Sequence, residues 1–248
     1  MIPIKSKEEL DILRRAGKIL GIIIKELFEF TKAGVSTEEI DRLAESLFKK
    51  NKVEPAFKGY KGFPASICTS TNAEIVHGIP GSRELKEGDI IGLDVGVIYN
   101  GYFSDAAVTK GIGKISPQAQ KLLEVTKSSL SEGIKQAKAG NHLYDISSAI
   151  QGMVEKNGFS IVREFVGHGI GAKLHEEPEI PNFGNSGQGP VLASGMVLAI
   201  EPMVNVGTWK SRILDNNWTA VTKDGLLSAH FEHTVAITEN GPEILTNI

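Results

Sequence analysis

The chain has 248 residues with a net charge of -3, of which 41% are hydrophobic and 23% are charged. This composition is typical of a globular protein that buries a large core, and it argues against a dedicated nucleic-acid binder, which carries a basic excess. A single cysteine, Cys68, excludes an intramolecular disulfide framework, and the longest near-apolar run, residues 19–24, is too short to span a bilayer. The first twenty residues lack a signal-peptide pattern, so we expect a cytoplasmic protein without membrane segments.

Capping patterns predict two helix pairs. Ser6 with Glu9 and Ser36 with Glu39 form capping boxes, and Ser116-Pro117 places proline in a first helical turn. A fourth helix follows the third. The expected helices run from Ser6 to about Gly34, from Ser36 to about Asn51, from Ser116 to about Gly140, and from there to about Asn157.

An internal repeat relates the two helix pairs. The tripeptide KAG at residues 32–34 recurs at 138–140, and Lys50-Asn51 recurs at the same offset of 106 as Lys156-Asn157. β-type segments follow each pair, and Asp94 and Glu201 each lie six residues after a glycine. We therefore expect one α/β domain over residues 1–248 with pseudo-two-fold halves of about 1–112 and 113–248. Helices should pack outside a shared antiparallel-type sheet, with the site where the halves meet.

In the first half, the Asn100-Gly101 dipeptide predicts a two-residue hairpin turn. Tyr99 would then face Tyr102, and Gly96 would face Asp105. Asp94 would share the face of Asp105 as a diagonal neighbour, roughly 7–8 Å away at the backbone. We expect Gly96 to leave open space beside these carboxylates, which repel each other unless cations lie between them.

The second half contributes three further candidates. Glu201 follows the segment LAI, Glu232 lies in the alternating segment HFEHTVAIT, and His168 lies on a loop between two glycines. Taken singly, each has an ordinary explanation: an exposed acid, a loop histidine, or an acid paired with His230 or His233. Together with the first-half acids they favour a metal site. The oxygen-rich set suits Mn²⁺, Fe²⁺ or Co²⁺ better than structural zinc, and its size fits two ions that share bridging carboxylates and activate a water.

Five sequence blocks resemble one known family over essentially the whole chain. They are VHGIP (76–80), LDVGVIYNGYFSDAA (93–107), GHGIGAKLHEEP (167–178), AIEPMV (199–204) and WTAVTKDGLLSAHFEHT (218–234). The chain resembles the bacterial type I methionine aminopeptidases of the M24 metallopeptidases. The resemblance implies the pita-bread fold and removal of the initiator methionine from new polypeptides when the second residue is small. It also implies two divalent ions (Co, Mn, Fe or Zn).

The resemblance assigns roles to named residues. Asp94 would chelate one ion, His168 and Glu201 the other, and Asp105 and Glu232 would bridge them. Glu201 would also move a proton during catalysis. The remaining positions are His77 and His175, which would contact substrate beside the scissile bond, and Phe57, Tyr60, Phe63, Cys68 and Trp218, which would line the methionine pocket.

Some expectations concern the surroundings of the site. The two acids after His175, Glu176 and Glu177, are expected in solvent. Asn72 and Ser228 lie where some relatives bind a monovalent cation, and the sequence leaves that question open. The partners implied are nascent polypeptide N-termini, with no specific nucleic acid and no membrane. Transient docking to the ribosome would suit such a substrate, and we expect a monomer.

Three alternatives stay in view. A prolidase or Xaa-Pro aminopeptidase shares the fold but generally carries a large preceding domain, whereas in this chain the catalytic pattern begins almost at the first residue. A type II methionine aminopeptidase has a helical insertion between its last two glutamate ligands, whereas only 30 residues separate Glu201 from Glu232. A non-catalytic binding relative would be expected to have lost ligands and gained a basic surface.

Overall fold

A computed structural model describes residues 2–247, in which the four predicted helices are present. Three helices begin directly after their predicted caps, and the Ser6–Glu9 and Ser36–Glu39 capping boxes both form. The fourth begins at Leu143, three residues after its expected start. Two helices end about four residues earlier than expected, because each KAG segment forms a turn whose glycine has a positive φ. Their bounds are α1 Lys7–Phe30, α2 Thr37–Asn51, α3 Pro117–Gln136 and α4 Leu143–Lys156.

The two KAG turns make equivalent contacts in the two halves. Gly34 has φ +85° and donates its N–H to the carbonyl of Leu85, while Gly140 has φ +92° and donates to the carbonyl of Leu192. In both halves, then, the turn after the first helix is fastened to the segment that leads into the sheet. The sequence repeat corresponds to a repeat in backbone contacts.

A nine-stranded sheet lies at the centre of the fold, with the path β1-β4-β5-β14-β9-β7-β8 and with β2 and β15 joined to β4 and β14. Its strands are β1 Glu54–Pro55, β2 Cys68–Thr71, β4 Ile90–Tyr99, β5 Tyr102–Gly111, β7 Gly167–Gly169, β8 Glu176–Ile180, β9 Val197–Ile200, β14 Glu232–Thr238 and β15 Gly241–Ile244. Two three-stranded sheets contain β13-β10-β6 and β11-β12-β3. Their strands are β3 Glu74–Val76, β6 Ser160–Ile161, β10 Met203–Asn205, β11 Ser211–Ile213, β12 Ala220–Thr222 and β13 Ser228–His230.

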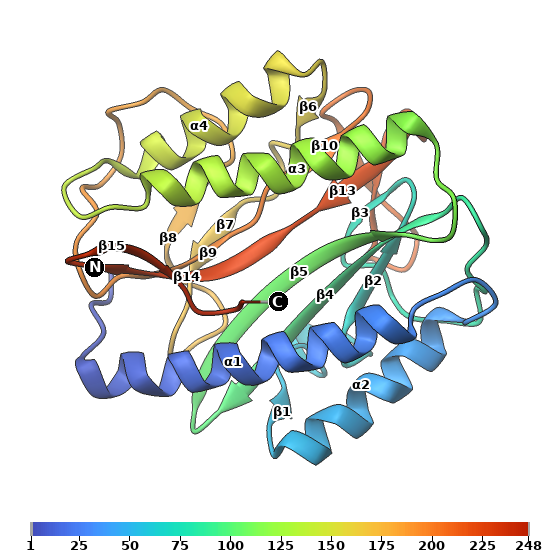
Figure 1. Cartoon of the computed structure of the whole chain (residues 1–248), viewed down its shortest axis with the longest axis horizontal. Coiled ribbons are helices and arrows are strands. Elements are labelled where there is room, and N and C mark those ends of the chain that lie inside the picture. Colours follow the sequence, from blue (N-terminus) through green and yellow to red (C-terminus); the bar gives the residue numbers. More distant parts are fainter. Residues whose placement is uncertain (1, 248) are drawn as a thin grey trace.

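The helices cover the sheet in two pairs, as Figure 1 shows. One core cluster packs apolar side chains of α1 and α2 against β4 and β5, and a second packs α3 and α4 against β9 and β14. A third cluster, which includes Phe57, Phe63 and Cys68, lies beside the candidate site. The expected α/β pita-bread architecture, with helices outside a shared antiparallel sheet, is confirmed.

The hairpin register matches the sequence prediction. Tyr99 pairs with Tyr102 and Gly96 with Asp105, so Asp94 and Asp105 are diagonal neighbours on one face. The expectation of open space at Gly96 is wrong, because a Cβ there would lie 2.7 Å from the ring of Phe57. The absent side chain makes room for an aromatic ring that forms the edge of the cavity.

The two halves of the sheet join where β5 pairs with β14. Glu232 is in register with Ala107, and the hydroxyl of Thr234 accepts the N–H of Asp105 at 3.0 Å and donates to its carbonyl at 2.7 Å. We call this junction the β5–β14 seam. This seam places Asp105 of the first half close to Glu232 of the second half.

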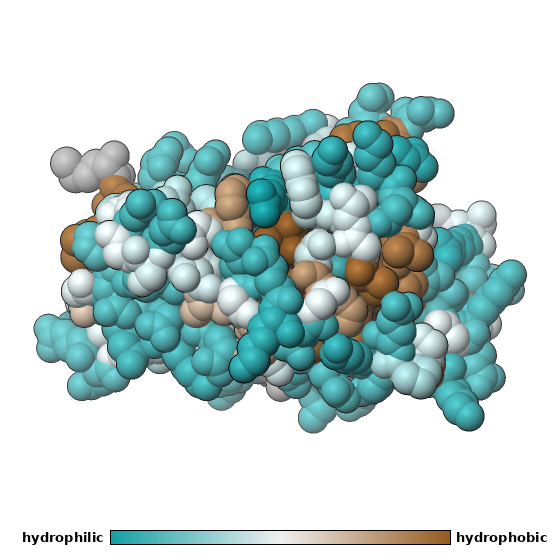
Figure 2. All heavy atoms as spheres, turned by 90° about the horizontal axis from the view of Figure 1, so that it is seen from above, coloured by the Kyte–Doolittle hydropathy of each residue, from teal (hydrophilic) through white to brown (hydrophobic). Residues whose placement is uncertain are grey.

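The outer surface is largely polar on the side seen from above in Figure 2, where apolar side chains form small patches among hydrophilic residues. Among residues 2–247, none of the helices contains an apolar stretch of the length that a bilayer crossing needs.

Candidate metal centre

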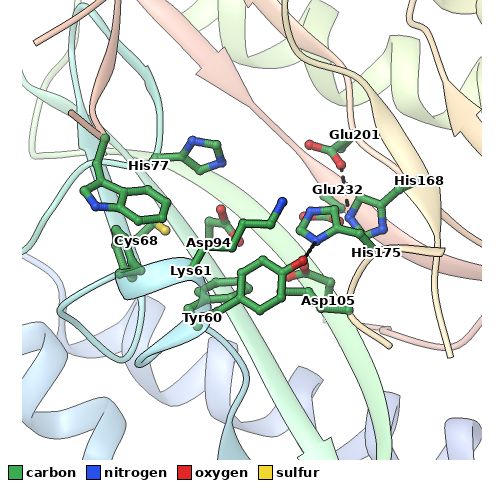
Figure 3. Close-up of a pocket in the computed structure, with 14 residues that line it drawn as sticks. Tyr60, Lys61, Cys68, His77, Asp94, Asp105, His168, His175, Glu201 and Glu232 are labelled. Atoms are coloured by element: carbon green, nitrogen blue, oxygen red, sulfur yellow. Dashed lines mark hydrogen bonds and ion pairs between the residues drawn. The ribbon is translucent and has the colours of Figure 1, made fainter. Parts of the chain in front are cut away.

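Four acids from four different strands or strand ends meet at the seam. Asp94 lies in β4, Asp105 in β5, Glu232 begins β14, and Glu201 directly follows β9. Figure 3 shows the four carboxylates facing one cavity, and all of them line it. The sequence prediction that these acids gather is therefore matched by the structure, although Glu201 lies just past the end of its strand.

His168 reaches the same cluster from β7. The structure places it in a strand, which corrects the expected loop. The flanking glycines are needed because β7 is held closely by its neighbours: a Cβ at Gly169 would lie 2.1 Å from the carbonyl oxygen of Glu177. At Gly167 it would lie 2.4 Å from the carbonyl oxygen of Ala199. The bare backbone thus serves strand packing, and the packing fixes the position of His168.

The tautomer of His168 follows from its hydrogen bond. Its Nδ1 lies 2.9 Å from the carbonyl oxygen of Gly169, an acceptor, so Nδ1 carries the proton. Nε2 is left with its lone pair, 3.5 Å from Oε1 of Glu201. Burial lowers the pKa of His168 to about 3, with the nearby His175 adding to the effect. A neutral imidazole with a free Nε2 is the form that binds a metal.

Burial dominates the electrostatics of the acids. It raises the pKa of Asp94 to about 7, against a smaller opposing effect of the Cys68 thiol. Burial also raises the pKa of Asp105, Glu201 and Glu232 well above the usual carboxyl range, and mutual repulsion among the acids adds to the shift. Four such groups in one place are costly unless a cation compensates them.

The donor atoms fit divalent metal. Ligand atoms of Asp105, His168 and Glu232 lie within 4.8 Å of one another. Within residues 2–247, Oδ1 of Asp94, Oδ1 of Asp105 and Oε1 of Glu232 are buried without a hydrogen-bond partner. Buried polar atoms are nearly always satisfied, so these orphaned oxygens are available as ligands. A set of carboxylates and one imidazole suits hard or borderline divalent cations.

The cavity that the acids line has a volume of about 180 Å³, and apolar and aromatic side chains form much of its remaining wall. Phe63 and Trp218 meet edge to face, with ring centroids 5.1 Å apart, and Cys68 pairs in register with Asp94. All five predicted pocket residues line this cavity: Phe57, Tyr60, Phe63, Cys68 and Trp218. Burial and the neighbouring acids raise the pKa of the Cys68 thiol well above its ordinary value, which disfavours a nucleophilic role.

The two remaining predicted histidines stand at different edges of the cavity. His77 has φ +59° and packs edge to face against Phe165 and Trp218. Burial lowers the pKa of His77 to about 4, so its ring is neutral at pH 7. His175 lies over the cluster, with its ring centroid 4.2 Å from that of His168 and its Nδ1 2.8 Å from the Tyr60 hydroxyl (Figure 3).

Three features were not predicted from the sequence. His230 is buried with Nε2 3.7 Å from Oε2 of Glu201, so it faces the carboxylate of Glu201 and is not paired with the adjacent Glu232. Glu176 was expected in solvent, but its carboxylate is almost fully buried against Lys5. Lys61 also lines the cavity. Sequence reasoning treated His230 only as an ordinary partner of Glu232, because pairing across strands cannot be read from adjacency.

Fold and site together have the features of a metal-dependent hydrolase: buried acids and a neutral histidine beside a substrate-sized cavity. Residues 11–239 match the model of metallopeptidase family M24. The chain is 56% identical to a methionine aminopeptidase of Clostridium perfringens, with 100% of both chains covered. It therefore belongs to metallopeptidase family M24.

Solved structures agree with this assignment. A methionine aminopeptidase from Thermotoga maritima matches with a TM-score of 0.98 and 46% identity, covering 100% of both chains. A prolidase from Pyrococcus furiosus matches with a TM-score of 0.81 and 26% identity, covering 99% of this chain and 65% of the prolidase. The resemblance noted in the sequence is confirmed, and the full-length matches favour the aminopeptidase over the prolidase.

Proposed function

We propose that the protein removes the N-terminal methionine from newly made polypeptides whose second residue is small. The observation that carries the proposal is the apolar, aromatic-lined cavity that ends on the buried carboxylate cluster. Such a cavity holds an unbranched thioether side chain, and the cluster lies where the following peptide bond would be. The full-length similarity to a methionine aminopeptidase supports the same substrate class.

We assign the cluster to two divalent ions of the Mn, Fe, Co or Zn type. Asp94 would hold one ion, His168 and Glu201 the other, and Asp105 and Glu232 would lie between them. When bound, the ions would supply a nucleophilic water of lowered pKa and Lewis acidity toward the scissile carbonyl. Glu201 lies in the cluster with one carboxylate oxygen facing His168, which suits it to carry a proton from water to the leaving nitrogen.

The remaining side chains would bind and orient the peptide. Phe57, Phe63, Cys68 and Trp218 would enclose the methionine side chain, and Tyr60 would hold His175 through their hydrogen bond. His77 and His175, on opposite sides of the cluster, would donate hydrogen bonds to the peptide near the scissile bond. We further propose one catalytic domain that acts in the cytoplasm as a monomer on nascent chains, with transient ribosome contact.

The test is release of amino acids from short peptides by Mn²⁺-loaded protein. Met-Ala-Ser and Met-Gly peptides should be cleaved, and Met-Leu or Met-Lys peptides poorly. Glu201→Gln should lower turnover by about 10²–10⁴-fold, because the proton carrier is lost. Glu239→Gln, which changes an exposed acid of the same half, serves as the matched control. Faster cleavage of Leu-Pro peptides than of Met-Ala-Ser would instead support the prolidase alternative.

A further inference from the structure

The lysine just before α1 is buried. We call residues 2–5, which precede α1, the N-terminal arm. The backbone N–H of Lys5 donates to the carbonyl of Gly195 at 2.8 Å, which fastens this arm to the segment leading into β9. The Lys5 ammonium donates to Oε2 of Glu176 at 2.5 Å, with only 4% and 8% of the two side chains exposed. A charge pair this deeply buried is costly to separate, so it fixes the distance between the arm and β8.

The carboxylate of Glu176 also closes the turn that precedes it. Its second oxygen, Oε1, accepts the backbone N–H of Lys173 at 3.1 Å. Gly171 begins this segment and leaves the space that the lysine occupies, since a Cβ there would lie 2.3 Å from Cε of Lys5. The carbonyl of Gly171 accepts the N–H of Phe103 at 2.8 Å. Segment 171–176 is thus held by the arm on one side and by β5 on the other.

His175 belongs to this held segment. The residue as a whole is exposed, unlike the buried His168, and its ring packs against the rings of Tyr60 and His168, with centroids 5.3 and 4.2 Å away. The ring has one hydrogen bond to a side chain, from Nδ1 to the Tyr60 hydroxyl, and Figure 3 shows it pointing over the acid cluster. The backbone at His175 is held by its two neighbours: Leu174 is buried, and Glu176 begins β8, where it pairs with Gly169 and forms the ion pair with Lys5.

We propose that the Lys5–Glu176 ion pair is a positioning device that holds His175 over the reacting peptide bond. This inference rests on the proposed function, because it assigns His175 a contact with the peptide. The pair acts through the backbone of segment 171–176 and touches neither substrate nor metal. Loss of either charge lets the turn relax, so that His175 no longer meets the substrate in the geometry that the transition state requires.

The experiment measures kcat, KM and Mn²⁺ stoichiometry for Met-Ala-Ser with wild type, Lys5→Met and Glu176→Gln. The control is Arg14→Met, which breaks the half-exposed Arg14–Glu243 pair between α1 and β15. We expect Lys5→Met and Glu176→Gln to lower kcat and kcat/KM alike by about 10–100-fold, the pattern of an interaction made in the transition state. Full Mn²⁺ binding should be retained. Arg14→Met should keep wild-type kcat.

A second comparison separates positioning from stability. In a His175→Ala background, adding Lys5→Met should change kcat by less than about 2-fold, because both changes remove the same interaction. The double variant Lys5→Met/Glu176→Leu fills the space with apolar side chains and should regain melting temperature while kcat stays low. The inference is overturned if the double variant recovers kcat together with its melting temperature. It is also overturned if Lys5→Met lowers kcat by the same factor in the His175→Ala background as in wild type. Inactive wild type would instead reject the proposed function.

Discussion

The two histidines of the segment GHGIGAKLHEEP have different surroundings, so we expect their alanine variants to affect metal binding and turnover differently. His168 is buried, neutral and held by its Nδ1 hydrogen bond, whereas His175 is exposed and bonded to Tyr60. His168→Ala should lower Mn²⁺ stoichiometry. His175→Ala should keep both ions and lower turnover by about 10²–10³-fold, as loss of an oxyanion-type hydrogen bond does.

Calorimetric titration of Mn²⁺ into the two purified variants checks this assignment, with peptide turnover measured on the same samples. His142→Ala, at the start of α4, is the matched control for the loss of an imidazole outside the cavity. If His175→Ala loses an ion and His168→Ala does not, the proposed roles of the two histidines are reversed.

His230 gives a second prediction at the scale of one residue. Its Nε2 is buried, has no hydrogen-bond partner within 3.5 Å among residues 2–247, and faces Oε2 of Glu201 at 3.7 Å. His230→Leu should lower kcat by about 10-fold, equivalent to about 1.4 kcal/mol, because the carboxylate loses an orienting partner. His230→Gln, which can place an amide N–H in the same region, should retain most of the activity. Equal kcat values for the two variants would show that the polar group of His230 does not matter.

Among the elements, those set by local signals were predictable. The capping boxes fixed the helix starts, and the Asn-Gly turn fixed the β4–β5 register, which placed Asp94 and Asp105 correctly. The glycine of each KAG was read as a helix end, although the helices stop earlier to form a turn. Local sequence rules indicate that a helix ends nearby. They do not give the exact last residue, because that depends on long-range contacts such as the hydrogen bond from Gly34 to Leu85.

Contacts between segments far apart in the chain could not be predicted from the sequence. The sequence placed His168 on a loop because two glycines flank it, whereas β8 and β9 hold it in a strand. Glu176 looked solvated because it stands beside another acid, yet its partner Lys5 is 171 residues away. The five predicted metal ligands nevertheless line one cavity. Their roles, carried over from the resemblance, stay predictions.

The seam between β5 and β14 yields a prediction at the scale of strands. Thr234 makes two hydrogen bonds to the backbone of Asp105 across the seam. Thr234→Val should lower the free energy of unfolding by about 1–3 kcal/mol, because two backbone groups lose their partner. It should also weaken Mn²⁺ binding, since Asp105 shifts relative to Glu232.

The matched control is Thr238→Val in the same strand, whose hydroxyl bonds to Gly241 in the turn to β15, away from the cluster. Chemical denaturation and Mn²⁺ calorimetry on both variants make the comparison. If Thr238→Val weakens metal binding as much as Thr234→Val does, the effect belongs to β14 in general and not to the seam.

At the scale of the molecule, the metal-free protein should become less stable as pH rises from about 6.5 to about 8. The pKa of Asp94 is raised to about 7, and those of the other three acids are raised well above their ordinary range, mainly by burial. In the unfolded chain the same acids ionise near pH ~4. Across this window the folded state holds more protons, so the free energy of unfolding falls as pH rises.

The buried histidines act in the opposite direction but at lower pH. The pKa values of His168 and His230 are lowered to about 3, so most of their effect develops below the unfolded value of about 6.5 and fades as the pH rises above it. Melting temperatures of chelator-treated and Mn²⁺-loaded protein at about pH 6.5, 7.2 and 8 provide the measurement. The difference between the two forms should widen with pH, because the bound cation compensates ionised acids. A metal-free melting temperature that rises across the window would contradict the prediction.

Because acids of both halves meet at the β5–β14 seam, a cation bound there would couple the two halves of the chain. Acids from residues before about 112 and after 113 lie on opposite sides of this junction, so an ion held by both sets would connect them. Thermodynamic reciprocity then requires that whatever draws the halves together raises metal affinity, and that metal draws the halves together to the same degree. A peptide whose methionine packs on Phe57 and Trp218 spans the first half and the second in the same way. Metal affinity would thus rise when substrate occupies the cavity, so the change in metal affinity would report how strongly the two halves are held together.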